Sequence, residues 1–202
     1  MFALVESGSI TQMLGGNQGI QIGDLKYPKA IYTLWTEAER NAIGIYTVEY
    51  DDSNRKDEQW YINTNQSYAF ADNKVTATYG TATAKSHADT LWTAEDEDNE
   101  LGTEGEVATR GLKYNLIQTV KAQAANELAK TDWYITRKSE KNTAIPSAIT
   151  THRDAVRSKQ AAMETAITNA SDTAALETLY TFTKQDDGSI ARPLGELPTL
   201  KL

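Results

Sequence analysis

The sequence predicts an α+β chain: a small, mostly antiparallel N-terminal β unit, a long αα-hairpin and an extended C-terminal tail. Three observations carry this prediction. Short aromatic and β-branched stretches separated by turn signals fill residues 1–84. Apolar residues recur every three or four positions between residues 112 and 170, which is the spacing of one helix face. Prolines and glycines interrupt residues 181–202 and favour an extended course.

The N-terminal 84 residues are expected to form a docking domain made of short strands. The strands are expected at 2–5, 9–14, 20–25, 30–34, 45–50, 60–62, 67–70 and 75–79. One short helix interrupts them. It begins at Thr36, which fits a capping box with Glu39, and it ends at Gly44.

Residues 85–105 have a different composition and are expected to be an acidic linker. The run from Glu95 to Glu100 contains five carboxylates, and clustered carboxylates suit Ca²⁺. The ligand spacing of an EF-hand is absent, however, so a solvated linker is the favoured interpretation. Gly102 and Gly105 indicate a hinge between the β unit and the helices.

Residues 106–180 are expected to form a helical hairpin that also mediates oligomerisation. The first helix carries an apolar stripe that Trp133 and Ile135 extend, and a turn around Pro146 leads to the second helix. Ser171 is the expected N-cap of a short third helix. Two narrow stripes bury little area, so we expect a third packing partner, either the β unit or another copy. The residues expected at this interface are Leu112, Leu116, Val120, Leu128, Trp133, Ile149, Val156, Met163 and Ile167.

Composition excludes several classes of protein. The net charge of −8 gives the 202-residue chain no general attraction to nucleic acid or to anionic membranes. There is no cysteine, and therefore no disulfide or thiolate metal site. The first residues lack the pattern of a signal peptide, and no stretch approaches the ~20 apolar residues of a membrane helix. The leucines of the tail are expected either to lie against another subunit or to fray.

No catalytic constellation is visible, and we expect no enzyme, no cofactor and no bound metal. The two histidines, His87 and His152, cannot form a zinc-binding pair at helical spacing, and His152 is expected at a helix interface. No serine has the context of a nucleophile elbow. Paired acids at 51–52, 57–58 and 186–187 have the character of turn residues. Trp60 and Trp92 are candidate sugar-stacking residues, although aromatic residues in short strands more often belong to a core.

Two groups of motifs resemble proteins of tailed bacteriophages. Residues 131–138 (TDWYITRK), 143–146 (TAIP) and 152–157 (HRDAVR) resemble the C-terminal helical segment of phage tail proteins, a group that includes tail-fibre components and tail-fibre assembly proteins. His152 stands where that pattern more often has an aromatic residue. Residues 16–20, 27–28, 34–36 and 43–45 resemble N-terminal segments of hypothetical phage virion proteins.

The resemblance implies a structural component of a phage tail, in a fibre or at the attachment of the fibre to the baseplate. It implies synthesis in the host cytoplasm, location in the virion, self-association as a trimer and contact with other tail or fibre proteins. Two alternatives stay open. One is a tail-fibre assembly chaperone, and the other is an adhesin domain that binds a host surface glycan through aromatic side chains such as Trp60.

Overall fold

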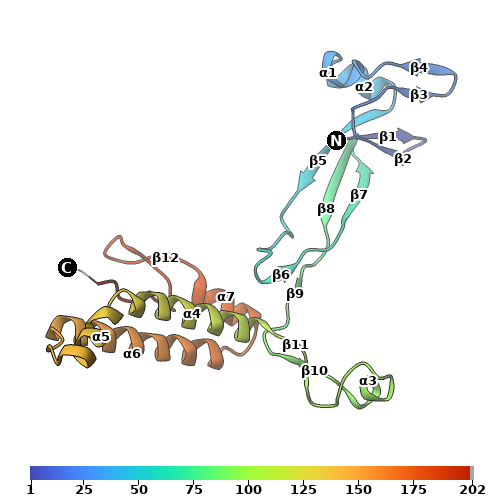
Figure 1. Cartoon of the computed structure of the whole chain (residues 1–202). Helices are drawn as coiled ribbons and strands as arrows, with labels where there is room; N and C mark the ends of the chain where they lie inside the picture. The colour runs from blue at the N-terminus through green and yellow to red at the C-terminus, as the bar shows by residue number, and fades with distance from the viewer. Residues whose placement is uncertain (201–202) are drawn as a thin grey trace. The chain divides into compact units, whose positions relative to one another are not determined.

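The computed structural model describes residues 1–200 and confirms the mixed α+β class, with a sheet first and helices after it. The chain forms two compact units, Met1–Thr83 and a second unit that begins at Ala84. Their elements are labelled in Figure 1, and each unit is described by itself below.

The first unit is built on a five-stranded sheet. Its strands lie in the order β2-β1-β5-β8-β7, and only the central β5–β8 pair is parallel. The sheet is therefore mostly antiparallel, as predicted. The strands are β1 Phe2–Glu6, β2 Ser9–Leu14, β5 Ile45–Asp51, β7 Gln66–Ala71 and β8 Lys74–Tyr79.

Both faces of this sheet bury apolar side chains, because neighbouring residues of a strand point to opposite faces. On β1, Leu4 belongs to one cluster, whereas Ala3 and Val5 belong to the other. The first cluster contains Leu4, Leu14, Ile20, Ile31, Tyr32 and Ile45, and the second contains Ala3, Val5, Val48, Val75 and Ala77.

Short elements complete the first unit. They are β3 Ile20–Ile22, β4 Leu25–Tyr27, α1 Ile31–Leu34, α2 Glu37–Ala42 and β6 Tyr61–Ile62; β9 Thr83–Ala84 lies at its end. The strand predicted at 30–34 is wrong, because this segment is α1. The Leu34 N–H donates to the Ala30 carbonyl, and burial falls on the adjacent pair Ile31 and Tyr32 instead of alternating.

The capping box at Thr36 is confirmed. The Thr36 hydroxyl accepts from the Glu39 N–H at 3.3 Å, and the Glu39 carboxylate accepts from the Thr36 N–H at 2.7 Å. The latter bond lowers the pKa of Glu39. Gly44 follows the helix at φ +84°, where a Cβ would also lie 2.7 Å from the Val5 carbonyl oxygen. Glycine is needed there for both reasons.

The second unit opens with a small hairpin rather than with unstructured chain. Strands β10 Thr90–Leu91 and β11 Val107–Thr109 pair antiparallel, and helix α3 Ala94–Asp98 lies in the connection between them. Thr93 and Asp96 form the capping box of α3. A Cβ on Gly102 would lie 2.3 Å from the Trp92 indole nitrogen, so Gly102 makes room for that ring. The hinge at Gly102 and Gly105 stays a prediction.

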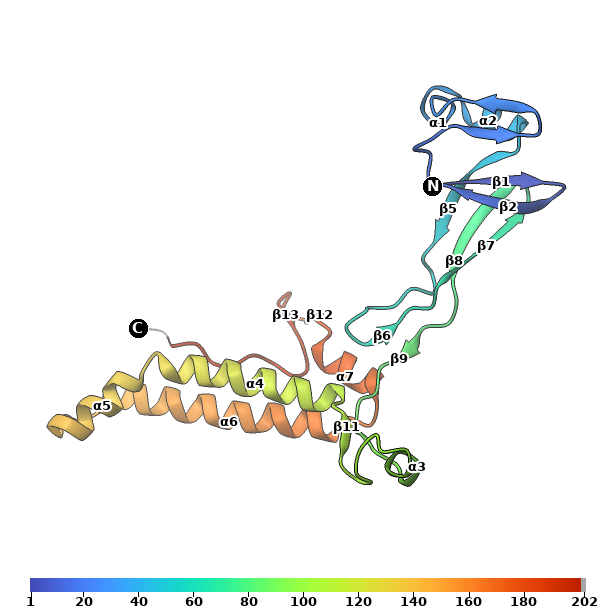
Figure 2. The same cartoon turned by 45° about the vertical axis from the view of Figure 1, so that its right-hand side comes forward.

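The helices that follow are α4 Leu112–Ala129, α5 Asp132–Lys141, α6 Ser147–Asn169 and α7 Thr173–Tyr180. Helices α4 and α6 pack side by side, as the two views in Figures 1 and 2 show. The first limb of the hairpin, expected as one helix, is broken between Ala129 and Asp132. The N-cap of α7 is Asp172, whose carboxylate accepts from the Ala175 N–H at 2.8 Å, so the prediction of Ser171 is wrong.

The tail returns along the helices of its own chain. It forms the short hairpin of β12 Thr183–Lys184 and β13 Ile190–Ala191, with Gly188 at φ +82° in the turn. Leu194 is then buried, and its N–H donates to the Leu179 carbonyl at 3.0 Å. This leucine is therefore covered within the chain, without a second subunit.

Candidate functional site

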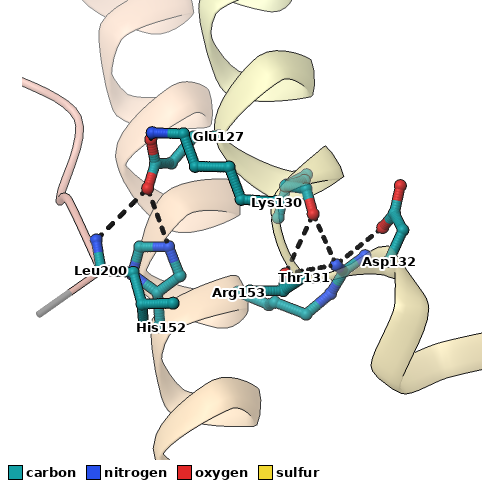
Figure 3. Close-up of polar contacts among 8 residues, drawn as sticks. Glu127, Lys130, Thr131, Asp132, His152, Arg153 and Leu200 are labelled. Atoms are coloured by element: carbon teal, nitrogen blue, oxygen red, sulfur yellow. Dashed lines mark hydrogen bonds and ion pairs between the residues drawn. The ribbon is translucent and has the colours of Figure 1, made fainter. Parts of the chain in front are cut away.

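A buried arginine fixes the junction between α4 and α5. Arg153 reaches from α6, and its Nη1 donates to the Leu128 carbonyl at 2.8 Å, the Thr131 hydroxyl at 2.7 Å and the Asp132 carboxylate at 2.8 Å (Figure 3). The last carbonyls of a helix have no partner within it. The Leu128 carbonyl, at the end of α4, accepts from the N–H and the hydroxyl of Thr131, and Arg153 adds a charged donor to it. Arg153 also holds the first residue of α5 through Asp132.

A second buried contact ties the tail to the same place. One Glu127 oxygen lies 3.3 Å from the His152 Nε2 and accepts from the Leu200 N–H at 3.2 Å, while Lys130 bonds to the other (Figure 3). The hydrogen bond from Lys130 lowers the pKa of Glu127, so the carboxylate stays charged. Arg153 and Glu127 thus connect α4, α5, α6 and the tail, and His152 is buried at the helix interface, as predicted.

Beyond this junction, α5 buries none of its residues. Trp133 is 51% exposed and Ile135 is 42% exposed, so the expectation that they extend the buried stripe is wrong. The apolar stripe stops because the chain turns at Thr131, where Arg153 binds the end of α4. The side chains of α5 are left on the surface.

The exposed aromatic residues of α5 are organised around a cation. The rings of Trp133 and Tyr134 lie 4.1 Å apart, and the Arg137 guanidinium carbon is 4.7 Å from the Trp133 ring centre and 5.8 Å from that of Tyr134. Such stacking orders the rings and leaves the cation next to them. We call Trp133, Tyr134, Arg137 and Lys138 the tip patch.

Aromatic residues and arginine are the types that dominate binding energy at protein interfaces, because they bury much area at little entropic cost. The tip patch therefore has the chemistry of a docking surface for a protein. It overlaps the motif at 131–138 on which the resemblance to phage tail proteins rests.

The other predicted interface residues have different surroundings. Leu112, Leu116 and Leu128 are partly buried on α4. Five are buried inside the single chain, so their burial needs no second copy. These five are Val120, Ile149, Val156, Met163 and Ile167.

The paired acids serve in turns. Of the two sugar-stacking candidates, Trp60 is buried and Trp92 is half-buried. Carboxylates of Asp51, Asp57 and Asp187 each accept from the backbone N–H two residues further on, at 2.8–2.9 Å. Trp60 is 3% exposed, so its ring cannot stack on a surface glycan. Within residues 1–200, no three histidine or acidic side chains gather as metal ligands do, and no helix there is long and apolar enough to span a bilayer.

Sequence reasoning missed Arg153 and Glu127 as a pair of anchors. Each is an ordinary charged residue of an amphipathic helix, and the partners through which they join separate elements lie 21 or more residues away. The one local signal was their position: both fall on the apolar face of their helix, one turn from Ala124 or Ile149.

Comparison with known proteins adds no relative. No family model, no curated protein and no solved structure matches the chain.

Proposed function

We propose that this chain is a structural component of a bacteriophage tail, in a fibre or at the attachment of the fibre to the baseplate, and that it acts by protein–protein assembly rather than by catalysis. The tail context comes from the resemblance at residues 131–138, 143–146 and 152–157. Self-association and contact with other tail proteins belong to the same proposal.

One observation supports an assembly role above all others: α5 presents the tip patch and buries nothing of its own. A solitary exposed tryptophan would be unremarkable, but here two rings and a guanidinium form an ordered stack. Two buried contacts hold the helix junction from which α5 projects. Preorganisation of this kind reduces the entropy lost on binding.

The test is peptide mass spectrometry on purified, salt-washed particles of the phage that encodes the chain, with copy number measured against the major capsid protein. We expect a low, fixed copy number that survives the salt wash. Absence from particles together with abundance in the infected-cell lysate would contradict a structural role and favour the assembly chaperone.

A genetic arm links the particle test to the tip patch. Phage lacking the gene is complemented with the wild-type chain, with Trp133→Ala, or with Leu25→Ala, a control on a comparably exposed leucine of the first unit. We expect Trp133→Ala to lower the copy number in particles and the control to leave it unchanged. Equal incorporation of all three would contradict the role given to the tip patch.

A further inference from the structure

A second exposed apolar surface lies in the hairpin of residues 90–109. Leu91 and Val107 pair across β10 and β11 and are both exposed, and Leu101 is 60% exposed. Seven acidic residues and no lysine or arginine lie between residues 94 and 106. We call Leu91, Leu101, Val107 and the exposed carboxylates of Glu95, Asp98 and Glu100 the acidic patch.

The two patches have opposite charge around apolar centres. The tip patch contains Arg137 and Lys138, and Lys141 lies one turn further on. Helix α5 contains three basic residues and two acidic ones, Asp132 and Glu140, and Asp132 is already bound by Arg153. The chain as a whole has a net charge of −8, so a basic aromatic surface on it is a local exception.

Helix α4 keeps the two patches of one chain apart. The acidic hairpin ends at Thr109, just before α4 begins at Leu112, and α5 begins at Asp132, just after α4 ends. An 18-residue helix is about 27 Å long. Figures 1 and 2 both show α3 and α5 at opposite ends of α4. The patches cannot meet within one molecule.

We propose that the tip patch of one copy binds the acidic patch of the next copy. The contact would bury Trp133 against Leu101 and the Leu91–Val107 pair, with Arg137 and Lys138 facing carboxylates at the rim. Because two different surfaces meet, the interface is heterologous, and it closes into a ring or extends as a filament. The trimer implied by the resemblance is such a ring.

The inference rests on the proposed assembly function and names the partner of the tip patch. Three full-length variants test it. The tip variant is Trp133→Ala with Arg137→Glu, and the acidic-patch variant is Leu101→Ala with Asp98→Lys. The control is Leu25→Ala with Lys26→Glu, which alters a leucine of matched exposure, 62%, and reverses one charge in the first unit. The residues of both capping boxes are left intact.

Light scattering coupled to size exclusion measures each variant alone and in mixtures. We expect the wild type and the control to assemble into multiples of 22.3 kDa, and the tip and acidic-patch variants to be monomers, each weakened at least about thirtyfold. Each of these two retains one intact patch. An equimolar mixture of them therefore has one productive pairing and should give a 1:1 dimer that salt weakens.

Three results would overturn the inference: a wild-type monomer at high micromolar concentration, an acidic-patch variant that assembles like the wild type, or no dimer in the mixture of two folded variants. Circular dichroism establishes folding, and the milder pair Arg137→Gln and Asp98→Asn replaces any variant that loses helix. The particle experiment tests the tail role separately from this contact. A chain that is present in tails but monomeric in solution would refute the contact and would not affect the proposed tail role.

Discussion

Helices α4 and α5 follow each other in the chain with two residues between them, yet they use their apolar side chains in opposite ways. Helix α4 buries Val120 and Ala124, beside α6. Helix α5 has a tryptophan and an isoleucine and buries neither. The difference lies in what each helix packs against, because both contain apolar residues that could be buried.

The residue that separates the two behaviours is Arg153. It binds the end of α4 and the start of α5 at once, and so replaces a continuous helix by a junction. An amphipathic pattern therefore indicates that a helix face can be buried. The buried side chain of Arg153 determines where along the chain that burial ends. Helix α5 is free for a partner because its junction is stabilised by side chains outside it.

The largest expected effect comes from placing a carboxylate on the buried face of α6, compared with the same change on the surface of α5. Val156→Asp puts a carboxylate where 0% of the side chain is exposed, and we expect it to lower the free energy of unfolding by about 4 kcal/mol. Ile135→Asp, on α5, is the matched control and should cost less than about 0.5 kcal/mol. Urea unfolding followed by circular dichroism measures both. Similar losses would mean that α5 is packed after all.

The next largest effect is expected at the junction itself. Arg153→Met removes hydrogen bonds from a charged donor to the Leu128 carbonyl, the Thr131 hydroxyl and the Asp132 carboxylate, and hydrogen bonds to charged groups contribute about 1.5–3 kcal/mol. The Leu128 carbonyl still accepts from the N–H and the hydroxyl of Thr131, so we expect a loss near the lower end of that range. Hydrogen exchange should quicken at residues 128–132. Arg157→Met, one turn along α6, loses only an exposed ion pair with Asp154 and should change little. If both variants behaved alike, Arg153 would not define the junction.

A smaller effect is expected on the free energy of unfolding when the Glu127 carboxylate is protonated at low pH. Its pKa in the folded state lies below the ordinary value of 4.5, chiefly because of Lys130. The stabilisation is therefore fully present above pH 4.5 and is lost as the pH falls through the folded-state pKa. Groups facing this carboxylate are Lys130, His152 and the Leu200 N–H.

The wild type should thus lose stability below pH 4.5 relative to Glu127→Gln, which has no carboxylate to protonate. Urea midpoints of the wild type and of Glu127→Gln between pH 6 and pH 3 measure the difference. A wild-type curve parallel to that of Glu127→Gln would show that Glu127 does not couple the tail to the helices.

Local chemistry was readable from the sequence. The capping box at Thr36 needs only residues within one turn, and so does the turn at 186–189, and both are as predicted. The strand predicted at 30–34 failed, because five residues without clear alternation fit either a strand or a helix, and the segment forms the hydrogen bond from the Leu34 N–H to the Ala30 carbonyl. The packing of Gly102 against Trp92 could not be predicted, because the two residues meet within a hairpin that the acidic composition did not indicate.

The candidate site depended on contacts that no local pattern shows. The residues of the tip patch could be identified in the sequence as a motif. Their exposure could not be predicted, because Trp133 and Ile135 continue the apolar stripe of α4 in the sequence. Only the bond from Arg153 to Thr131, 22 residues apart, reveals where that stripe ends. The burial of Trp60 likewise follows from tertiary packing, which composition alone does not resolve.

The smallest expected effect is on the stability of Trp133→Ala. A tryptophan removed from a core typically costs about 3–5 kcal/mol, but this ring is 51% exposed on a helix that buries nothing, so we expect a change within about 0.5 kcal/mol. Met163→Ala on α6 is the buried comparison and should cost about 2–5 kcal/mol. Thermal and urea unfolding of dilute, monomeric protein measure both. A large loss at Trp133 would place it in the core of a single chain and remove the tip patch as a docking surface, whereas a stable variant that fails to associate would separate folding from binding at this residue.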